Sequence, residues 1–335
     1  MPTRGVKVPS AAMSNYSVTP PTHAFPMVRI AADADTALEA VRKDEILDLF
    51  REHGAVLLRG FTTSLDGFGA FARDFCPVPV FNESGKRIVL DGASGVQSVN
   101  LGNKPFPLHP ELSREPWRPD AAFFYCATPP SSGGQTTICD GIEIVRQLPE
   151  TMRAEMEGRR IRYAVPATAA DLQYWLGATN PDDALLADPP AQCPFTFEWH
   201  GGQLMRCFTR PLLQPSRFQG ELAWGNFILF TRYLRGVKTY PVMDDWSLVP
   251  DRWVEEVKRV SDRLTVPVGW HANDIVMLDN SRFMHGRTEI VPGDGRRIAT
   301  YFGYLDGVAP DPEEPPAPPW RREGFMPPQL AMRAQ

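Results

Sequence analysis

The sequence predicts a mainly β protein, a sandwich or barrel, with α-helices inserted between two blocks of short strands. Short apolar runs bounded by glycine, proline or charged residues fill residues 87–139 and return in residues 275–302. Helix-period patterns interrupt them between residues 141 and 264. Because strands and helices do not alternate one by one, a parallel α/β sheet is not indicated. No internal repeat or low-complexity linker divides the chain, which favours one contiguous domain.

The N-terminal quarter is predicted to mix α and β structure. Apolar residues at helical spacing predict a helix from Asp35 to His53, and Gly54 is a natural stop after it. The apolar run Ala55 to Leu58 predicts a buried strand. Thr63 with Asp66 three residues later is a capping-box arrangement, which predicts the start of a second helix.

Strand-like runs follow, and then helical patterns. The expected strands are Arg87 to Leu90, Val96 to Val99, Ala121 to Cys126 and Gln135 to Cys139. The expected helices are Gly141 to Gln147 behind an Asp140 cap, Pro149 to Glu157, Ala169 to Leu176, Asn226 to Leu234 and Arg252 to Leu264. In the last segment the runs Ile275 to Leu278 and Ile298 to Phe302 predict two strands, with a Pro-Gly-Asp-Gly turn between them.

Composition and charge argue against several classes of protein. The 335 residues carry a formal net charge of -5, and no basic run interleaved with aromatic residues offers a surface for nucleic acid. No apolar run approaches the roughly 18 residues that cross a bilayer. The N-terminus lacks the apolar core of a signal peptide, so we expect a cytoplasmic protein with no membrane partner. The five cysteines form no CxxC arrangement, which predicts reduced, packed thiols.

Proline concentrates at the two ends of the chain. Pro20 and Pro21 come early, and a late tract runs from Ala309 to Trp320. Such tracts form neither a helix nor a sheet ladder. We therefore expect an extended N-terminal segment at residues 1–30, one domain at 31–305 and a Pro-rich C-terminal tail at 306–335. The tail could lie across a second subunit, so an oligomer stays open.

Two histidines and a glutamate offer the ligand set of a metal centre. His109 and Glu111 are two residues apart, so both side chains face the same side of an extended backbone. His285 lies in the last strand block, near an arginine pair at positions 296–297. Two imidazoles and a carboxylate suit iron(II) with open positions, and guanidinium groups suit an anionic ligand. An HxE triplet alone is common by chance.

Five segments match one known family in type and order. They are GAVLLRGF at Gly54 to Phe61, HPE at His109, FFYCATPPSSGGQTTICDG at Phe123 to Gly141, GELAWGNF at Gly220 to Phe227 and LDNSRFMHGRTEIVPGDGRRI at Leu278 to Ile298. On these segments the chain resembles the iron(II)- and 2-oxoglutarate-dependent oxygenases of the taurine dioxygenase group. Within the group it is most similar to the clavaminate synthase-like and SyrP-like branch.

The resemblance implies a fold, a ligand set and a reaction. The expected core is a double-stranded β-helix (jelly-roll, cupin-like) with an N-terminal α/β portion and a helical excursion. His109, Glu111 and His285 are the expected iron(II) ligands, and Thr136 with Arg297 is expected to hold the distal carboxylate of 2-oxoglutarate. The family oxidises an aliphatic C–H bond with O2 while 2-oxoglutarate becomes succinate and carbon dioxide. Hydroxylation is the usual outcome, and desaturation, cyclisation and dealkylation stay open.

The choice of Arg297 over Arg296 uses strand alternation. Arg297 would share a face with Ala299, and this small residue is expected to leave room for a ligand. The family pattern also favours the second arginine. Arg296 remains the alternative.

Substrate contacts and partners are the least specific part of the prediction. Each candidate also has an ordinary structural explanation, such as a helix cap, a surface ion pair or a core position. Arg287 could instead brace the loop next to the metal. The candidates are Asn100, Asn103, Leu112, Ser113, Arg206, Asn226, Arg287 and Tyr301. The expected substrate is a small amino-acid-like or natural-product intermediate, free or presented by a peptide carrier protein.

Two alternatives come from other classes of protein. A zinc hydrolase would use the same His, Glu and His set without Thr136 or Arg297. A metal-free, cupin-like binding protein would keep the triad without using it.

Overall fold

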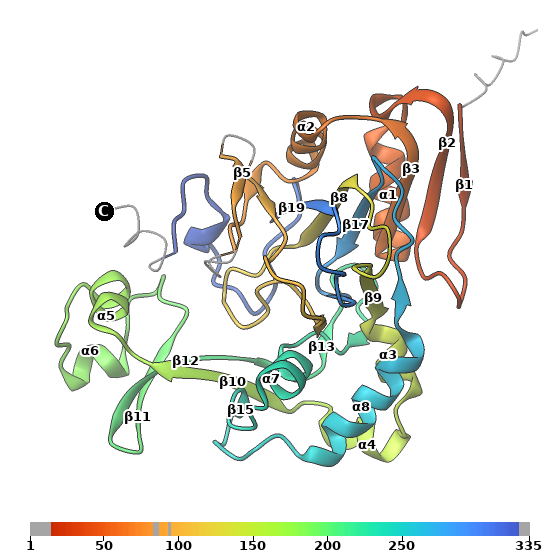
Figure 1. The fold of residues 1–335 in the computed structure, drawn as a ribbon. Helices are drawn as coiled ribbons and strands as arrows, with labels where there is room; N and C mark the ends of the chain where they lie inside the picture. The colour runs from red at the N-terminus through yellow and green to blue at the C-terminus, as the bar shows by residue number, and fades with distance from the viewer. Residues whose placement is uncertain (1–14, 83–86, 93–94, 328–335) are drawn as a thin grey trace, which may run out of the picture.

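The structure is a computed structural model, and it describes residues 15–82, 87–92 and 95–327. Its largest layer is a sheet with the strand order β1-β2-β3-β17-β8-β19-β6-β5, and β4 pairs with β19 beside this path (Figure 1). Strands β2 and β3 pair in parallel, and the other neighbours are antiparallel. The strands are β1 (Tyr16–Thr19), β2 (Val28–Ala37), β3 (Ala55–Thr62), β4 (Val78–Pro79), β5 (Val89–Asp91), β6 (Val96–Ser98), β8 (Ala121–Thr128), β17 (Ile275–Asp279) and β19 (Arg297–Tyr304).

A second, smaller sheet faces the large one. Its order is β16-β9-β18-β7, with β16 (Val266–Pro267), β9 (Thr136–Asp140), β18 (Phe283–Arg287) and β7 (Phe106–His109). Phe124 and Phe302 of the large sheet belong to the same buried cluster as Ile138 and Phe283 of the small sheet. Two sheets that bury their facing side chains against each other form one core. The prediction of a mainly β fold with inserted helices is confirmed.

Two helices cover the other face of the large sheet. They are α1 (Lys43–His53) and α2 (Leu65–Phe75). Strand alternation sends Leu57 to the core between the sheets, and Val56 and Leu58 to the cluster that contains Phe50 and Phe68 of the helices. The residues at 55–58 therefore form a strand that is buried on both faces, as the sequence predicts.

The first helix is shorter than the sequence suggests. Strand β2 runs through Ala37, where Ala37 pairs with Thr62 of β3, and the short 3-10 helix η1 (Leu38–Ala40) follows before α1 begins at Lys43. Pairing to β3 thus overrides the local helical pattern. The second helix is capped by Ser64, which accepts from the Gly67 N–H at 3.1 Å, rather than by Thr63.

The helical excursion also contains a sheet that the sequence did not suggest. Its order is β11-β12-β10-β15, with β11 (Thr196–His200), β12 (Gln203–Pro211), β10 (Arg160–Pro166) and β15 (Val242–Met243). The two-stranded pair β13 (Gln214–Pro215) and β14 (Leu222–Ala223) lies beside it in the chain. In β10 the buried Ile161 and Tyr163 alternate with more exposed residues, which is the two-residue period of a strand.

The helices expected in this region are present. Asp140 caps the first of them by accepting from the Ile142 N–H at 2.9 Å. The last is amphipathic, with Trp253, Val257 and Val260 on its buried side. The expected helices are α3 (Gly141–Gln147), α4 (Glu150–Met156), α5 (Ala169–Leu176), α7 (Ile228–Arg235) and α8 (Asp251–Leu264). The short helix α6 (Asp183–Ala187) was not expected.

The Pro-rich residues before position 328 pack against the body of the protein. Trp320, in the 3-10 helix η2 (Pro319–Arg321), is 1% exposed and belongs to the cluster between the two sheets. Arg321 beside it pairs with Asp120 at 2.8 Å and with Glu314 at 2.7 Å. At the other end, β1 and the start of β2 lie within residues 1–30 and pair into the large sheet.

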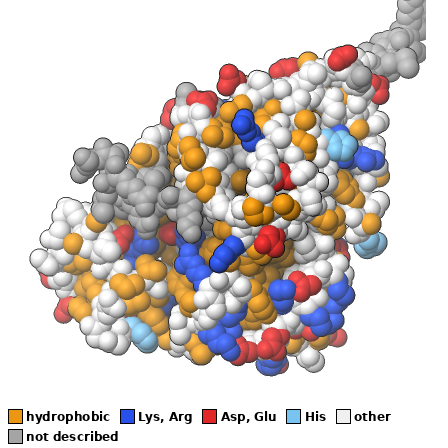
Figure 2. Space-filling model, viewed as in Figure 1, with side chains coloured by type: hydrophobic (Ala, Val, Ile, Leu, Met, Phe, Trp, Pro, Cys, Tyr) orange, Lys and Arg blue, Asp and Glu red, His pale blue; other side chains and the backbone are white. Residues whose placement is uncertain are grey.

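All five cysteines are free, and four of them are buried, as expected for packed thiols. Acidic, basic and hydrophobic side chains are interspersed on the face shown in Figure 2. Within the described residues, every helix is too short or too polar to cross a membrane.

Candidate active site and metal centre

Pairing between two neighbouring strands brings the two histidines together. His109 ends β7 and His285 lies at the centre of β18, where the two residues are direct partners in the antiparallel register. Side chains at such positions share one face of the sheet, and the imidazole centroids are 4.6 Å apart. Gly286 permits the close approach, because an added Cβ would lie 2.6 Å from the Phe106 carbonyl oxygen.

Glu111 lies in the turn after β7 and is fixed through its backbone. Its N–H donates to the Asn280 side-chain oxygen at 2.7 Å, and the Asn280 amide donates to the Glu111 carbonyl at 2.9 Å. The next residue, Leu112, has a left-handed backbone with φ of 49°. Asn280 lies in the connection between β17 and β18, so the loop that leads into the His285 strand also holds the segment that carries Glu111. Asn280 was not expected from the sequence.

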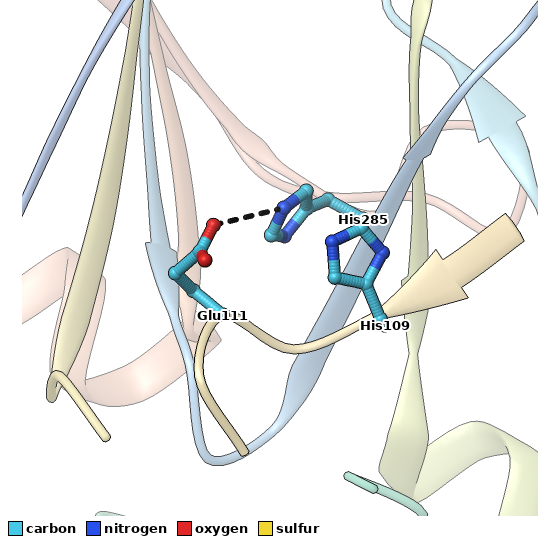
Figure 3. A group of neighbouring side chains, drawn as sticks. All are labelled: His109, Glu111 and His285. Atoms are coloured by element: carbon cyan, nitrogen blue, oxygen red, sulfur yellow. Dashed lines mark ion pairs between the residues drawn. The ribbon is translucent and has the colours of Figure 1, made fainter. Parts of the chain in front are cut away.

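The three side chains converge on one point, as Figure 3 shows. One ligand atom from each of His109, Glu111 and His285 lies within 4.8 Å of the other two, and His285 Nε2 is 3.7 Å from Glu111 Oε2. Imidazole and carboxylate ligands bind metal at about 2.0–2.2 Å, so atoms that share one ion are about 3–4.4 Å apart. The donor set and its spacing therefore fit a divalent metal ion, and all three residues are buried.

Burial keeps both imidazoles in the form that a metal needs. Desolvation lowers the pKa of His109 and lowers that of His285 well below its ordinary value, and the neighbouring His109 adds to the second shift. His109 Nδ1 is 2.9 Å from the Pro107 carbonyl oxygen. With a proton on Nδ1, the Nε2 lone pair is free for a metal.

Two further side chains hold the carboxylate of Glu111. Arg87 donates to Glu111 Oε2 at 3.0 Å, and the Asn82 amide donates to Oε1. Arg87 also donates to the Thr300 hydroxyl at 3.0 Å. A buried carboxylate needs such partners, since an unpaired buried charge is costly. From the sequence, Arg87 was expected only at the start of a strand.

The triad lies where two cavities meet. The outer cavity has a volume of about 790 Å³ and the inner one about 40 Å³. His109 lines both cavities, together with Asn100, Phe106 and Arg287. The inner cavity is also lined by Thr136 and His285, and the outer cavity by Glu111. A ligand on each side can therefore reach the same metal position.

The structure brings Arg296, and not Arg297, to the inner cavity. Arg296 lines the cavity with Thr136, and burial lowers its pKa to about 10. Arg297 is exposed at the start of β19. Side chains along β19 alternate between the two faces as expected. The face predicted to hold the ligand, that of Arg297 and Ala299, was the wrong one. Ile298 and its alternate residues face the core between the sheets, whereas Ala299 packs towards the helices.

Four of the eight predicted substrate contacts line the outer cavity, namely Asn100, Asn103, Leu112 and Arg287. Arg287 donates to the backbone carbonyls of Asn100 at 2.9 Å, Gly102 at 2.7 Å and Lys104 at 2.8 Å. It therefore braces the loop at the cavity wall, which is the second role that the sequence suggested for it.

Ser113 and Arg206 lie away from both cavities. Ser113 is buried, and its carbonyl accepts from Arg210 at 2.7 Å. Arg206 is buried and pairs with Asp171 at 2.7 Å and with Glu115 at 3.8 Å. The predictions for Ser113 and Arg206 are not supported. The Ser113 carbonyl already accepts from Arg210, and the Arg206 guanidinium is already paired with carboxylates.

Asn226 and Tyr301 are structural as well. Asn226 lies just before α7, where its side-chain oxygen accepts from the Ile228 N–H at 3.1 Å and its amide donates to the Leu212 carbonyl at 3.2 Å. The Tyr301 hydroxyl donates to the Cys76 carbonyl on the helix-covered side of the large sheet. The prediction for Tyr301 failed for the same reason as that for Arg297.

Several residues of the outer cavity were not expected from the sequence. Phe227 and Phe230 come from the start of α7, and their rings lie 5.7 and 5.0 Å from the His109 ring. Lys104, Arg114 and Arg235 also line the cavity. Phe227 ends the GELAWGNF segment, but nothing in the local sequence indicates which side of α7 faces a metal site.

Comparison with known proteins agrees with this geometry. The family model described as "Taurine catabolism dioxygenase TauD, TfdA family" matches residues 17–301. A clavaminate synthase-like protein from Arabidopsis thaliana is 22% identical over 82% of this chain and 89% of its own length. The alpha-ketoglutarate-dependent 2,4-dichlorophenoxyacetate dioxygenase of Cupriavidus pinatubonensis is 23% identical over 76% of this chain and 85% of its own.

Solved structures share the fold. The crystal structure of PvcB from Pseudomonas aeruginosa superposes with a TM-score of 0.57 at 13% identity, and covers 90% of this chain and 95% of its own. The matched family, its named relatives and the buried His, Glu and His group carry one conclusion. The chain belongs to the TauD/TfdA family and is a non-haem iron oxygenase that depends on Fe(II), 2-oxoglutarate and O2.

Proposed function

We propose that this enzyme oxidises, in the simplest outcome hydroxylates, an unactivated C–H bond of a small amino-acid-like or natural-product intermediate. The substrate would be free or tethered to a carrier protein. One observation carries the proposal: the triad lies where a small cavity lined by Thr136 and Arg296 meets an outer cavity of about 790 Å³. The small inner cavity suits an anionic cosubstrate, and the outer cavity has the size of a small-molecule site. The two packed sheets support a double-stranded β-helix core.

His109, Glu111 and His285 would hold the iron. Bound there, Fe(II) with 2-oxoglutarate and O2 would supply the oxidation, and the cosubstrate would leave as succinate and carbon dioxide. The two imidazoles would bind the metal in their neutral form, because burial lowers their pKa values. Arg87 and Asn82 orient the Glu111 carboxylate, and the buried surroundings keep bulk water from the site.

Arg296 and Thr136 would bind the distal carboxylate of 2-oxoglutarate. A half-buried guanidinium with a lowered pKa gains most from a short, charge-assisted hydrogen bond to a carboxylate. The inner cavity has about 40 Å³, which admits the carboxylate end alone. The keto acid end would then lie at His109, where the two cavities meet.

The outcome of the oxidation depends on how the substrate lies in the outer cavity. Desaturation, cyclisation and dealkylation would use the same centre as hydroxylation, with a different hydrogen atom next to the metal. Mass analysis of the product separates these outcomes, because hydroxylation alone adds one oxygen atom to the intact substrate.

The test is anaerobic addition of Fe(II) and 2-oxoglutarate to the purified protein. We expect the weak visible charge-transfer band of an iron-bound keto acid, and Glu111→Ala should abolish it. The band should persist in His271→Ala, because this exposed residue lies outside the triad. A folded protein that binds Fe(II) without the band, or a band that survives Glu111→Ala, would refute the proposed ligand set.

A further inference from the structure

The outer cavity combines an aromatic wall with a cationic mouth. Phe106, Phe227 and Phe230 line it, and their rings surround the His109 ring at 6.1, 5.7 and 5.0 Å. The surface next to the metal position is thus apolar on this side. An apolar or aromatic group would pack there and bring its C–H bonds towards the metal.

Two cationic side chains lie at the mouth of the cavity. Lys104 and Arg235 line the cavity and are exposed, and among the described residues neither side chain has an acidic partner. The Arg235 guanidinium lies 5.8 Å from the centroid of the Phe230 ring, which directs it along the aromatic wall. Arg114 adds a third positive group, although it also contacts Glu115 at 3.3 Å.

Among its described lining residues, the same cavity offers no free carboxylate to an ammonium group. Among the described lining residues, Glu111 is the only carboxylate. It belongs to the metal-binding triad, and it already accepts from Arg87 and Asn82. An ammonium group placed in the cavity would lose part of its hydration without a carboxylate partner, and it would face the positive side chains Lys104, Arg114 and Arg235. The charge pattern therefore discriminates between organic acids and amines.

We propose that the substrate is an acid with an apolar or aromatic body and no free ammonium group. Its body packs on Phe227 and Phe230 beside the metal, and its anionic group is held at the mouth by Lys104 and Arg235. The anion is a carboxylate of the substrate itself or the phosphate of a carrier arm. An amino acid fits only with its amine blocked. The inference rests on the proposed function and narrows its substrate class.

The experiment measures binding to the metal-free protein by calorimetry, with four probes that share one phenyl-propyl body. The probes are 4-phenylbutanoate, 4-phenylbutanamide, 4-phenylbutylamine and 4-phenylbutanoyl pantetheine phosphate. We expect the acid to bind about 3- to 10-fold more tightly than the neutral amide, and the amine to bind more weakly than the amide. Raising the salt concentration should reduce the preference for the acid.

Variants then locate the anion. Lys104→Gln and Arg235→Gln should each weaken binding of the acid about 3-fold or more and leave the amide nearly unchanged. Arg297→Gln removes an exposed arginine that lines neither cavity, and it should leave both probes unchanged. If the pantetheine phosphate binds more tightly than the acid and is weakened by the same variants, the anion is a carrier phosphate. If the free acid binds more tightly, the anion is the substrate's own carboxylate.

Three results would overturn the inference. They are an amine that binds as well as the acid, variants that weaken acid and amide equally, and an acid that does not bind at millimolar concentration. None of these depends on iron. A protein that prefers the acid but gives no charge-transfer band would instead refute the proposed function and leave the charge selectivity standing.

Discussion

The inner and outer cavities are built from different parts of the fold. Most of the residues that line the inner cavity lie in strands, and Thr136 in β9 and His285 in β18 belong to strands that pair on both sides. The outer cavity is lined by α7 and by the loop at residues 100–104 that Arg287 braces. Paired strands hold side chains more rigidly than loops do. The two histidine ligands and Thr136 thus lie on paired strands, whereas the outer cavity proposed for the substrate depends more on a helix and a loop.

Removal of a triad histidine should have the largest effect. His285→Ala deletes one of three metal ligands from a buried site, and we expect the dissociation constant for Co(II) to rise at least about 100-fold. Titration followed by the visible absorption of Co(II) measures this. His271→Ala is the control, and a triad variant that binds Co(II) as tightly as the control would contradict the metal centre.

Loss of the Asn280 amide should be the next largest effect. Asn280→Ala removes both hydrogen bonds to the Glu111 backbone, and we expect Co(II) affinity to fall about 10-fold or more. The matched control is Ser281→Ala, at the next residue of the same loop. This variant loses the hydrogen bonds that Ser281 makes with Asp279 and Arg217, and neither of them involves Glu111.

Both Asn280→Ala and Ser281→Ala should lower the melting temperature, so thermal unfolding is measured in parallel. If Asn280 only stabilises the fold, the two variants will lose similar stability, and neither will lose metal affinity. A selective loss of Co(II) binding in Asn280→Ala identifies it as a positioning residue for Glu111.

The arginine pair tests the inner cavity. Arg296→Gln should weaken 2-oxoglutarate binding about 10-fold, because the half-buried guanidinium can no longer donate a charge-assisted hydrogen bond to the cosubstrate carboxylate. Arg297→Gln, at the exposed neighbouring position, should change it less than about 2-fold. Titration of the charge-transfer band measures both. If Arg297→Gln weakened 2-oxoglutarate binding more than Arg296→Gln, the face predicted from strand alternation would be the correct one.

The smallest effect is expected in the outer cavity. Leu234 lines the outer cavity and is 37% exposed, so Leu234→Ala removes only part of an apolar contact. We expect 4-phenylbutanoate to bind about 2- to 5-fold more weakly, with 2-oxoglutarate affinity unchanged. An equal loss for both ligands would show that the two cavities are not independent.

The sequence predicted the strands and helices where local pattern and tertiary contacts agree. The strand at Ala55 to Leu58 and the helix after Asp140 form as expected, because short apolar runs and a capping side chain act locally. The helix expected to begin at Asp35 begins at Lys43, since residues up to Ala37 pair with β3 instead. Such pairing depends on a partner strand that no local pattern reveals.

The sequence by itself determined the chemical types in the site. The spacing of His109 and Glu111, the position of His285 and the matching segments indicated a His, Glu and His metal centre with an arginine nearby. The structure then brought these three side chains together. The same information could not choose between Arg296 and Arg297, because alternation fixes which residues share a face and not which face is inside.

Only the tertiary structure decided the inside face, the role of Asn280 and the walls of the outer cavity. Ile298 faces the other sheet and Ala299 faces the helices, so Arg296, and not Arg297, lines the inner cavity that we propose for the cosubstrate. Phe227, Phe230 and Arg235 reach the site because α7 packs beside β7. Contacts between elements far apart in the chain are set by packing of whole faces, which leaves no trace in local spacing.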